Sequence, residues 1–206
     1  FKDCCTNVIS DFYSNLENLK SQEKTIARFV HLISEYLELN TRNTVYFKGM
    51  GINEIISRVI AIRYGHLHKD GVNNLRVVYE GHWRSRKEGD LGIFMSGSGE
   101  TDHTLRYAWQ AGDIGMKLFA ITSFKESTLA RAIKWYRRSE GNLIIEGRPY
   151  MASYFNKSLR KVKEKFFPQF ELNTYLTLDS LLALIAKKNG ISEDDMKKTH
   201  RDKEFE

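Results

Sequence analysis

Between residues 44 and 145, short apolar runs alternate five times with segments in which apolar residues recur at helical spacing. Strands and helices that alternate with short connections are typical of a parallel sheet, because parallel neighbours need a crossover between them. We therefore predict an α/β fold, a three-layer αβα sandwich with a five-stranded parallel sheet. The predicted strands are 44–47, 75–79, 91–95, 117–122 and 143–145, and the helices between them are 53–66, 100–114 and 128–137.

Helical periodicity also precedes and follows this alternating region. Two helices are expected at about 6–19 and 21–40, and the chain from about residue 151 reads as mostly helical. No Pro-, Gly- or Ser-rich linker interrupts the 206 residues. We expect N-terminal helices over 1–40 that pack on one globular unit over 41–206.

Composition narrows the class of partner. The 32 Lys and Arg residues exceed the 26 Asp and Glu residues by six, but the two signs are interleaved along the chain. This balance favours small anions such as phosphates over a nucleic-acid partner. No apolar run reaches the roughly 18 residues that a membrane span requires, so no membrane partner is expected. The adjacent Cys4 and Cys5 indicate a reduced, cytoplasmic protein.

The run from Met95 to Thr101 carries the strongest chemical signal. An apolar strand leads into Gly97 and Gly99, with hydroxyls at Ser96, Ser98 and Thr101, and a helix follows at once. Backbone N–H groups at a helix start attract anions, and small hydroxyl side chains add donors. Helix capping alone is the simpler alternative, but it does not need two glycines and three hydroxyls. We predict a phosphate site.

The sequence partly matches two other known motifs, but neither match is complete. A serine-hydrolase elbow needs Gly-x-Ser-x-Gly, and a serine occupies the first position here. The first strand ends in Gly49-Met50-Gly51, but the third glycine of a dinucleotide fingerprint is replaced by Glu54, whose carboxylate would repel a pyrophosphate. The Gly-x-Gly still allows the backbone to approach a ligand beside the strand that precedes Ser96.

These motifs resemble the SIS (sugar isomerase) family of phosphosugar isomerases and phosphosugar binders, whose fold is flavodoxin-like. The closest match runs from residue 91 to 129 and includes Ser-Gly-Ser-Gly-Glu-Thr. Within the family, Arg63-Tyr64-Gly65-His66-Leu67 and Phe170-Glu171 are similar to the archaeal-type 6-phospho-3-hexuloisomerases. The resemblance covers roughly residues 40 to 200.

The resemblance implies roles for individual residues. Glu171 would be the acid–base carboxylate, with His66 and His200 as nearby polar groups, His200 reaching the site from the tail or from a neighbouring subunit. The sugar phosphate would be held by Ser96, Gly97, Ser98, Gly99 and Thr101. The sugar would be lined by Gly51, Asn53, Arg63 and Ser123. The family implies no cofactor, no metal, and a homodimer or homotetramer.

The chain departs from the subgroup in the first loop, where Arg-Ser-Gly is replaced by Ile52-Asn53-Glu54. A cationic donor is thereby lost and a negative charge is gained. We predict a phosphosugar isomerase that moves a proton between adjacent carbons through an enediol, with 3-hexulose 6-phosphate to fructose 6-phosphate as the example. A non-catalytic phosphosugar sensor is the alternative, and nucleic-acid binding through the basic tail is a third.

Overall fold

The structure is a computed structural model that describes residues 2–38, 43–68, 75–79, 86–147 and 169–201. Its five strands form one parallel sheet in the order β2-β1-β3-β4-β5. The strands are β1 (Val45–Lys48), β2 (Val77–Val78), β3 (Leu91–Met95), β4 (Lys117–Thr122) and β5 (Ser139–Ile144). The predicted α/β class and parallel sheet are confirmed. The strand order reverses between β1 and β3, which is where such sheets bind ligands beyond the carboxyl ends of their strands.

Two strands differ from the prediction in extent. β5 begins at Ser139 rather than 143, because its first half is polar and escapes a search for apolar runs. It lies at a sheet edge, where Glu140 pairs with Arg28 from the helix that covers it. β2, at the opposite edge, is reduced to two residues. Edge strands tolerate such short or polar sequences because one side of their backbone is unpaired.

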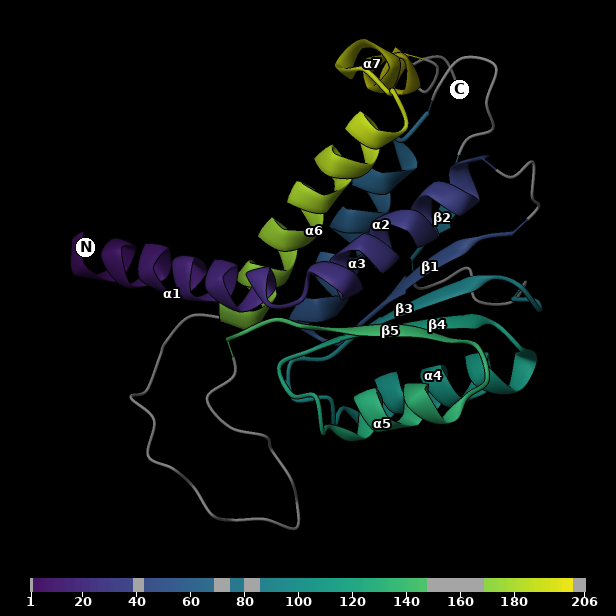
Figure 1. Cartoon of the computed structure of the whole chain (residues 1–206), viewed down its shortest axis with the longest axis horizontal. Helices are drawn as coiled ribbons and strands as arrows, with labels where there is room; N and C mark the ends of the chain where they lie inside the picture. The colour runs from purple at the N-terminus through teal and green to yellow at the C-terminus, as the bar shows by residue number, and fades with distance from the viewer. Residues whose placement is uncertain (1, 39–42, 69–74, 80–85, 148–168, 202–206) are drawn as a thin grey trace.

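Helices cover both faces of the sheet (Figure 1). One face carries α2 (Glu23–Glu38), α3 (Ile52–Gly65) and α6 (Gln169–Lys188), and the other carries α4 (Asp102–Ile114) and α5 (Thr128–Trp135). Two further helices lie at the ends of the chain: α1 (Lys2–Lys20) extends outward from the body, and α7 (Glu193–Arg201) follows α6. The expected helical region from residue 151 lies outside the described residues up to 168.

The core divides into two clusters, one on each face of the sheet. Val45 and Phe47 join the cluster under α2, α3 and α6, whereas Tyr46 between them joins the cluster with α4 and α5. The alternation follows from the two-residue period of a strand, which sends successive side chains to opposite faces. Side chains of β1 therefore reach both helical layers, and the direction of each residue at the strand end can be inferred from its position.

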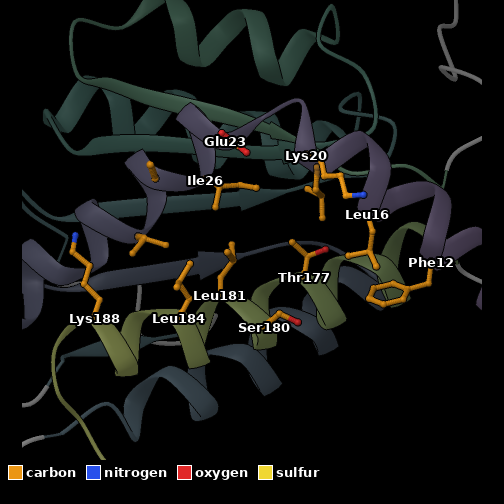
Figure 2. Close-up of a pocket in the computed structure, with 13 residues that line it drawn as sticks. Phe12, Leu16, Lys20, Glu23, Ile26, Thr177, Ser180, Leu181, Leu184 and Lys188 are labelled. Carbon is orange, nitrogen blue, oxygen red and sulfur yellow. The ribbon is translucent and has the colours of Figure 1, made fainter.

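The N-terminal helices contribute unequally to this core. Phe29, Leu32 and Ile33 of α2 are fully buried, while Ile9 and Tyr13 of α1 are 56% and 64% exposed. A groove of about 710 Å³ lies between α1, α2 and α6, and Figure 2 shows its largely apolar lining. It contains no residue of the 96–101 segment. The predicted boundary at residue 40 stays a prediction. Within the described residues, no helix is both long and apolar enough to span a bilayer.

Candidate functional site

The serine turn, residues 96–101, follows β3 and leads into α4. Gly99 adopts φ +68°, and a side chain there would collide with Ser127 and approach Thr122 Oγ1 to 2.9 Å. Glycine is therefore needed for both its conformation and its size. The Gly99 N–H donates to Ser96 Oγ at 3.0 Å, and the two hydroxyls of Ser96 and Thr101 are 3.0 Å apart. Three of the predicted phosphate residues thus form one compact turn.

The hydroxyls of this turn do not act as conventional caps of α4. Thr101 is the N-cap residue, yet its side chain makes no capping hydrogen bond. By contrast, Ser127 at the start of α5 accepts a hydrogen bond from Ala130 N at 3.3 Å. Ser98 Oγ accepts from Glu100 N at 3.2 Å, which leaves the hydroxyl proton as a donor. Ser98 and Thr101 are half-buried, so the turn reaches the surface. Donors at a helix start fit an anion better than capping alone.

Neighbouring segments hold the serine turn in place. Glu100 accepts hydrogen bonds from the backbone N–H and the hydroxyl of Thr128 at 2.8 and 2.7 Å, which ties the turn to the first turn of α5. Ser123 N donates to Gly97 O at 3.1 Å. The carboxylate of Glu100 is thus engaged by α5, and the turn is fixed independently of any ligand.

The glycine turn, residues 49–54, follows β1 and leads into α3. Gly51 adopts φ +62°, and a Cβ on Gly49 would fall 2.6 Å from Asn53 O, so both glycines allow α3 to begin at once. Asn53 in this first turn is buried, and its Nδ2 donates to Glu171 Oε1 at 3.2 Å. The structure therefore brings the predicted sugar residue and the predicted acid–base residue into contact across 118 positions of sequence.

Glu171 is positioned by the way the start of α6 meets the end of β5. Asn173 Nδ2 donates to Glu146 O at 2.9 Å, and the backbone of Gly147 lies against Phe170 so closely that a Cβ would not fit. Glu171 itself is 2% exposed in the first turn of α6. A carboxylate on the same edge as the serine turn is the geometry that proton transfer on an anchored substrate requires.

Two polar atoms next to Glu171 lack a hydrogen-bond partner within the described part of the chain. They are Asn53 Oδ1 and Thr174 Oγ1, and both are buried. Buried polar side chains in proteins are normally paired, so these two atoms are available to hydrogen-bond a ligand. The sequence offered no signal for Thr174, because one threonine in a helix is unremarkable until the helix is placed.

The remaining predicted residues do not converge on this edge. Ser123 lies beside the serine turn, but its hydroxyl donates to Ile145 O at 2.8 Å. Arg63 and His66 lie at the far end of α3, about 15 and 20 Å respectively from Asn53 at 1.5 Å per residue. Arg63 Nε bonds Asp179 Oδ1 at 2.8 Å, and His66 Nδ1 lies 2.6 Å from Thr199 Oγ1. Within one chain, neither reaches Glu171.

His200 belongs to α7, but its side chain lies outside the described residues. Among the residues that the structure describes, no group of three or more His, Cys, Asp or Glu side chains gathers as a metal site would require. Cys5 is exposed on α1 and is not paired in a disulfide.

Lys48 adjoins the glycine turn and was not among the residues that the sequence predicted for the site. It is the last residue of β1, directly before the glycine turn, and it is fully buried. Its Nζ lies 4.2 Å from the centroid of the Tyr107 ring on α4. Burial lowers the pKa of Lys48 to about 8, and the nearby Glu54 carboxylate opposes that shift. A lysine that ends an otherwise apolar strand is the signal that could have identified it.

Comparisons with known proteins find relatives of the chain along most of its length. No protein-family model matches the chain. An uncharacterized protein of Archaeoglobus fulgidus is 26% identical over 196 residues, which cover 94% of each chain. The 3-hexulose-6-phosphate isomerase of Methylomonas aminofaciens is 23% identical over 190 residues, or 88% of this chain and 97% of that enzyme. These similarities extend over most of the chain rather than over one motif.

Solved structures share the same fold. A hypothetical protein of Methanococcus jannaschii, whose crystal structure is described as inferring a molecular function of 3-hexulose-6-phosphate isomerase, has a TM-score of 0.66 and 21% identity over 95% of this chain and 94% of that one. The Vibrio vulnificus NanR protein complexed with ManNAc-6P has a TM-score of 0.68 and 16% identity over 96% and 67%. The chain has the fold of phosphosugar isomerases and sugar-phosphate binders.

Proposed function

We propose that this protein is a sugar-phosphate isomerase of the SIS type, with 3-hexulose 6-phosphate and fructose 6-phosphate as the substrate pair to test first. The observation that carries the proposal is the buried contact between Asn53 and Glu171 on the sheet edge that also holds the serine turn. The full-length similarity to a 3-hexulose-6-phosphate isomerase supports the same reaction class. No cofactor is needed for this chemistry.

The proposed reaction divides the work between the two turns. The serine turn holds the phosphate, which does not react, and its binding energy fixes the sugar relative to the base. Glu171 removes the C–H proton beside the carbonyl, which leaves an enediolate, and returns it to the neighbouring carbon. The hydroxyl proton passes to the former carbonyl oxygen. Asn53 orients the carboxylate through its hydrogen bond at 3.2 Å.

Replacement of Glu171 by Gln is the test of this assignment. The amide keeps the shape of the side chain but cannot accept the proton, so turnover should fall by about 10² or more while the affinity for the phosphosugar is largely retained. Interconversion of phosphoketoses followed by NMR, with calorimetry for binding, measures both quantities. Ser180→Ala on the exposed side of α6 is a matched control. Full activity in Glu171→Gln would show that another group is the base.

A non-catalytic phosphosugar sensor is the second candidate. It is favoured by Ile52, which is 50% exposed where the resembling enzymes carry an arginine, and by the fold shared with a protein solved with ManNAc-6P. This candidate predicts that phosphosugars raise the melting temperature without being converted. Turnover of any phosphosugar in the same samples would exclude it.

We also propose that the protein forms a homo-oligomer. Arg63 and His66 lie too far from Glu171 to serve it within one chain, so any role in the site requires a second copy. Ile9 and Tyr13 on the outward-pointing α1 provide apolar surface for such contacts. Sedimentation of the intact protein at several concentrations measures the assembly, and a strictly monomeric protein would exclude it.

A further inference from the structure

Lys48 occupies an unusual place for a lysine. Its side chain is fully buried at the end of β1, and its Nζ lies 4.2 Å from the centre of the Tyr107 ring. A buried ammonium is costly, and a methionine of similar length would fill the same space without that cost. A costly charge beside a ligand-binding edge needs an explanation that packing does not provide.

The sheet register places Lys48 close to the serine turn. The Cα partner of Lys48 is Phe94, and Ser96 follows Phe94 by two residues. Because side chains alternate along a strand, Lys48 and Ser96 point to the same face, where Phe94 packs against α4. Strands about 4.8 Å apart with a rise of about 3.3 Å per residue put the two Cα atoms about 8 Å apart.

Among the described residues, charged and titratable groups face Lys48 from α3, from α4 and from the connection before β3. Glu54 on α3 interacts electrostatically with the ammonium, and Tyr107 on α4 faces it. Arg86, in the connection before β3, interacts with Tyr107 and with Tyr46 of β1. Burial lowers the pKa of Lys48 to about 8, so at pH 7 most molecules carry the charge.

The glycine turn has no positive charge of its own to attract an anion. Residues 49–54 contain no lysine or arginine, and Glu54 adds a negative charge at the position where an anionic ligand must approach. A fixed cation on a residue whose Cα lies about 8 Å from that of Ser96, in surroundings less polar than water, attracts an anion much more strongly than the same cation would in solvent. Lys48 is the lysine that the fold places under this edge.

We propose that Lys48 supplies positive charge to a sugar phosphate docked on the serine turn, acting as a positioning residue from beneath that turn. The inference rests on the proposed function, because it requires an anion at residues 96–101. By linkage, a bound anion also favours the protonated lysine, so binding takes up protons near pH 8 and weakens as the pH rises above it.

The test compares the wild type with Lys48→Arg and Lys48→Met. Calorimetry measures the affinity for fructose 6-phosphate at pH 7.5 and 9.5, where its phosphate group is a dianion at both values. The affinity for inorganic phosphate, which is still partly a monoanion at pH 7.5, is compared between the variants at each pH. The wild type should bind several-fold more weakly at pH 9.5. Lys48→Arg should keep the pH 7.5 affinity and lose the pH dependence, because arginine stays charged. Lys48→Met should bind about tenfold more weakly at pH 7.5 and also lose the dependence.

The outcomes distinguish a failure of the role of Lys48 from a failure of phosphosugar binding itself. If Lys48→Met, shown to be folded by its melting curve, binds both probes as tightly as the wild type at pH 7.5, the inference is overturned while phosphosugar binding stands. A weaker Lys48→Met that keeps the wild-type pH dependence also overturns it, since a packing defect would then be the cause. If the wild type binds neither probe, the proposed function itself fails. Fructose without a phosphate is the control ligand, and its binding should not respond to Lys48.

Discussion

The serine turn and the glycine turn follow neighbouring strands of one sheet, but their polar groups are satisfied differently. In the serine turn, Ser96, Ser98 and Thr101 bond with groups inside the same six residues. In the glycine turn, Asn53 bonds with Glu171 on α6, 118 residues away. The hydroxyls of the first turn therefore bond within the turn itself, while α5 and the end of β4 hold its backbone and Glu100. In the second turn, Asn53 finds its side-chain partner through tertiary packing.

Under the proposed function, the serine turn anchors the phosphate and the glycine turn takes part in the reaction. A turn whose hydroxyls are arranged by one another can bind the same phosphate in proteins of different chemistry, because the phosphate is common to many sugars. A turn whose partner comes from a distant helix determines which sugar carbon faces the base. The predictions below test that separation, starting from the largest expected effect.

Alanine at Gly99 and at Gly51 should have very different costs, although both glycines have positive φ. At Gly99 the new methyl group meets Ser127, so the strain adds to a clash, and the free energy of unfolding should fall by about 3–5 kcal/mol. At Gly51 nothing lies within 4 Å of the new Cβ, and the loss should be about 1–2 kcal/mol. Urea denaturation measures both values. Equal losses would contradict the local rigidity of the serine turn.

Ser98→Ala and Asn53→Ala should separate binding from turnover. Loss of the Ser98 hydroxyl should weaken both phosphosugar and inorganic phosphate by about 10- to 100-fold, as expected for a hydrogen bond to a charged group. Loss of the Asn53 amide should leave phosphate affinity unchanged and lower kcat by about tenfold, because Glu171 loses its orienting donor. Calorimetry and steady-state kinetics give the two readings. Loss of phosphate affinity in Asn53→Ala would show that the two turns do not have separate roles in binding and turnover.

Lys48→Met should stabilise the protein while it weakens binding. The pKa of Lys48 is lowered to about 8 in the folded protein, so the folded state opposes the charge that the unfolded chain carries up to about pH 10.5. Wild-type stability should therefore rise with pH between about 8 and 10.5, by up to roughly 3 kcal/mol, and Lys48→Met should lack this rise. Thermal or urea unfolding across this range measures it. A parallel rise in the variant would assign the effect to another group.

Ile52→Arg restores a cation to the glycine turn and should have the smallest effect. Ile52 is half exposed at the start of α3, so an arginine there is tolerated without repacking. Phosphosugar affinity should rise about threefold at low ionic strength, and the gain should shrink in added salt. Ile55→Arg, one turn further along the exposed face of α3, is the matched control. An equal gain in affinity in that control would show that the added net charge, and not its position in the glycine turn, is the cause.

The features that could be predicted from the sequence are those encoded by neighbouring residues, and the features that could not depend on tertiary contacts. The sheet and the serine turn could be predicted because apolar runs, glycines and hydroxyls stand within a few residues of each other. The contact between Asn53 and Glu171 could not, since nothing local to either residue encodes where the start of α6 will dock against Glu146. Resemblance to a known family supplied Glu171, but it also supplied Arg63 and His66, which one chain does not bring to the same edge. The polar first half of β5 escaped because its edge position permits it.

Glu171 lies on a helix that follows the last strand of the sheet. The sheet and the serine turn therefore precede the proposed base in the chain, and the start of α6 joins them through contacts with the end of β5 and the start of α3. Replacement of α6 in this layout removes Glu171 and leaves every residue of the serine turn unchanged. Under the proposed function, such a replacement alone would turn an enzyme into a non-catalytic binding protein for the same phosphosugars.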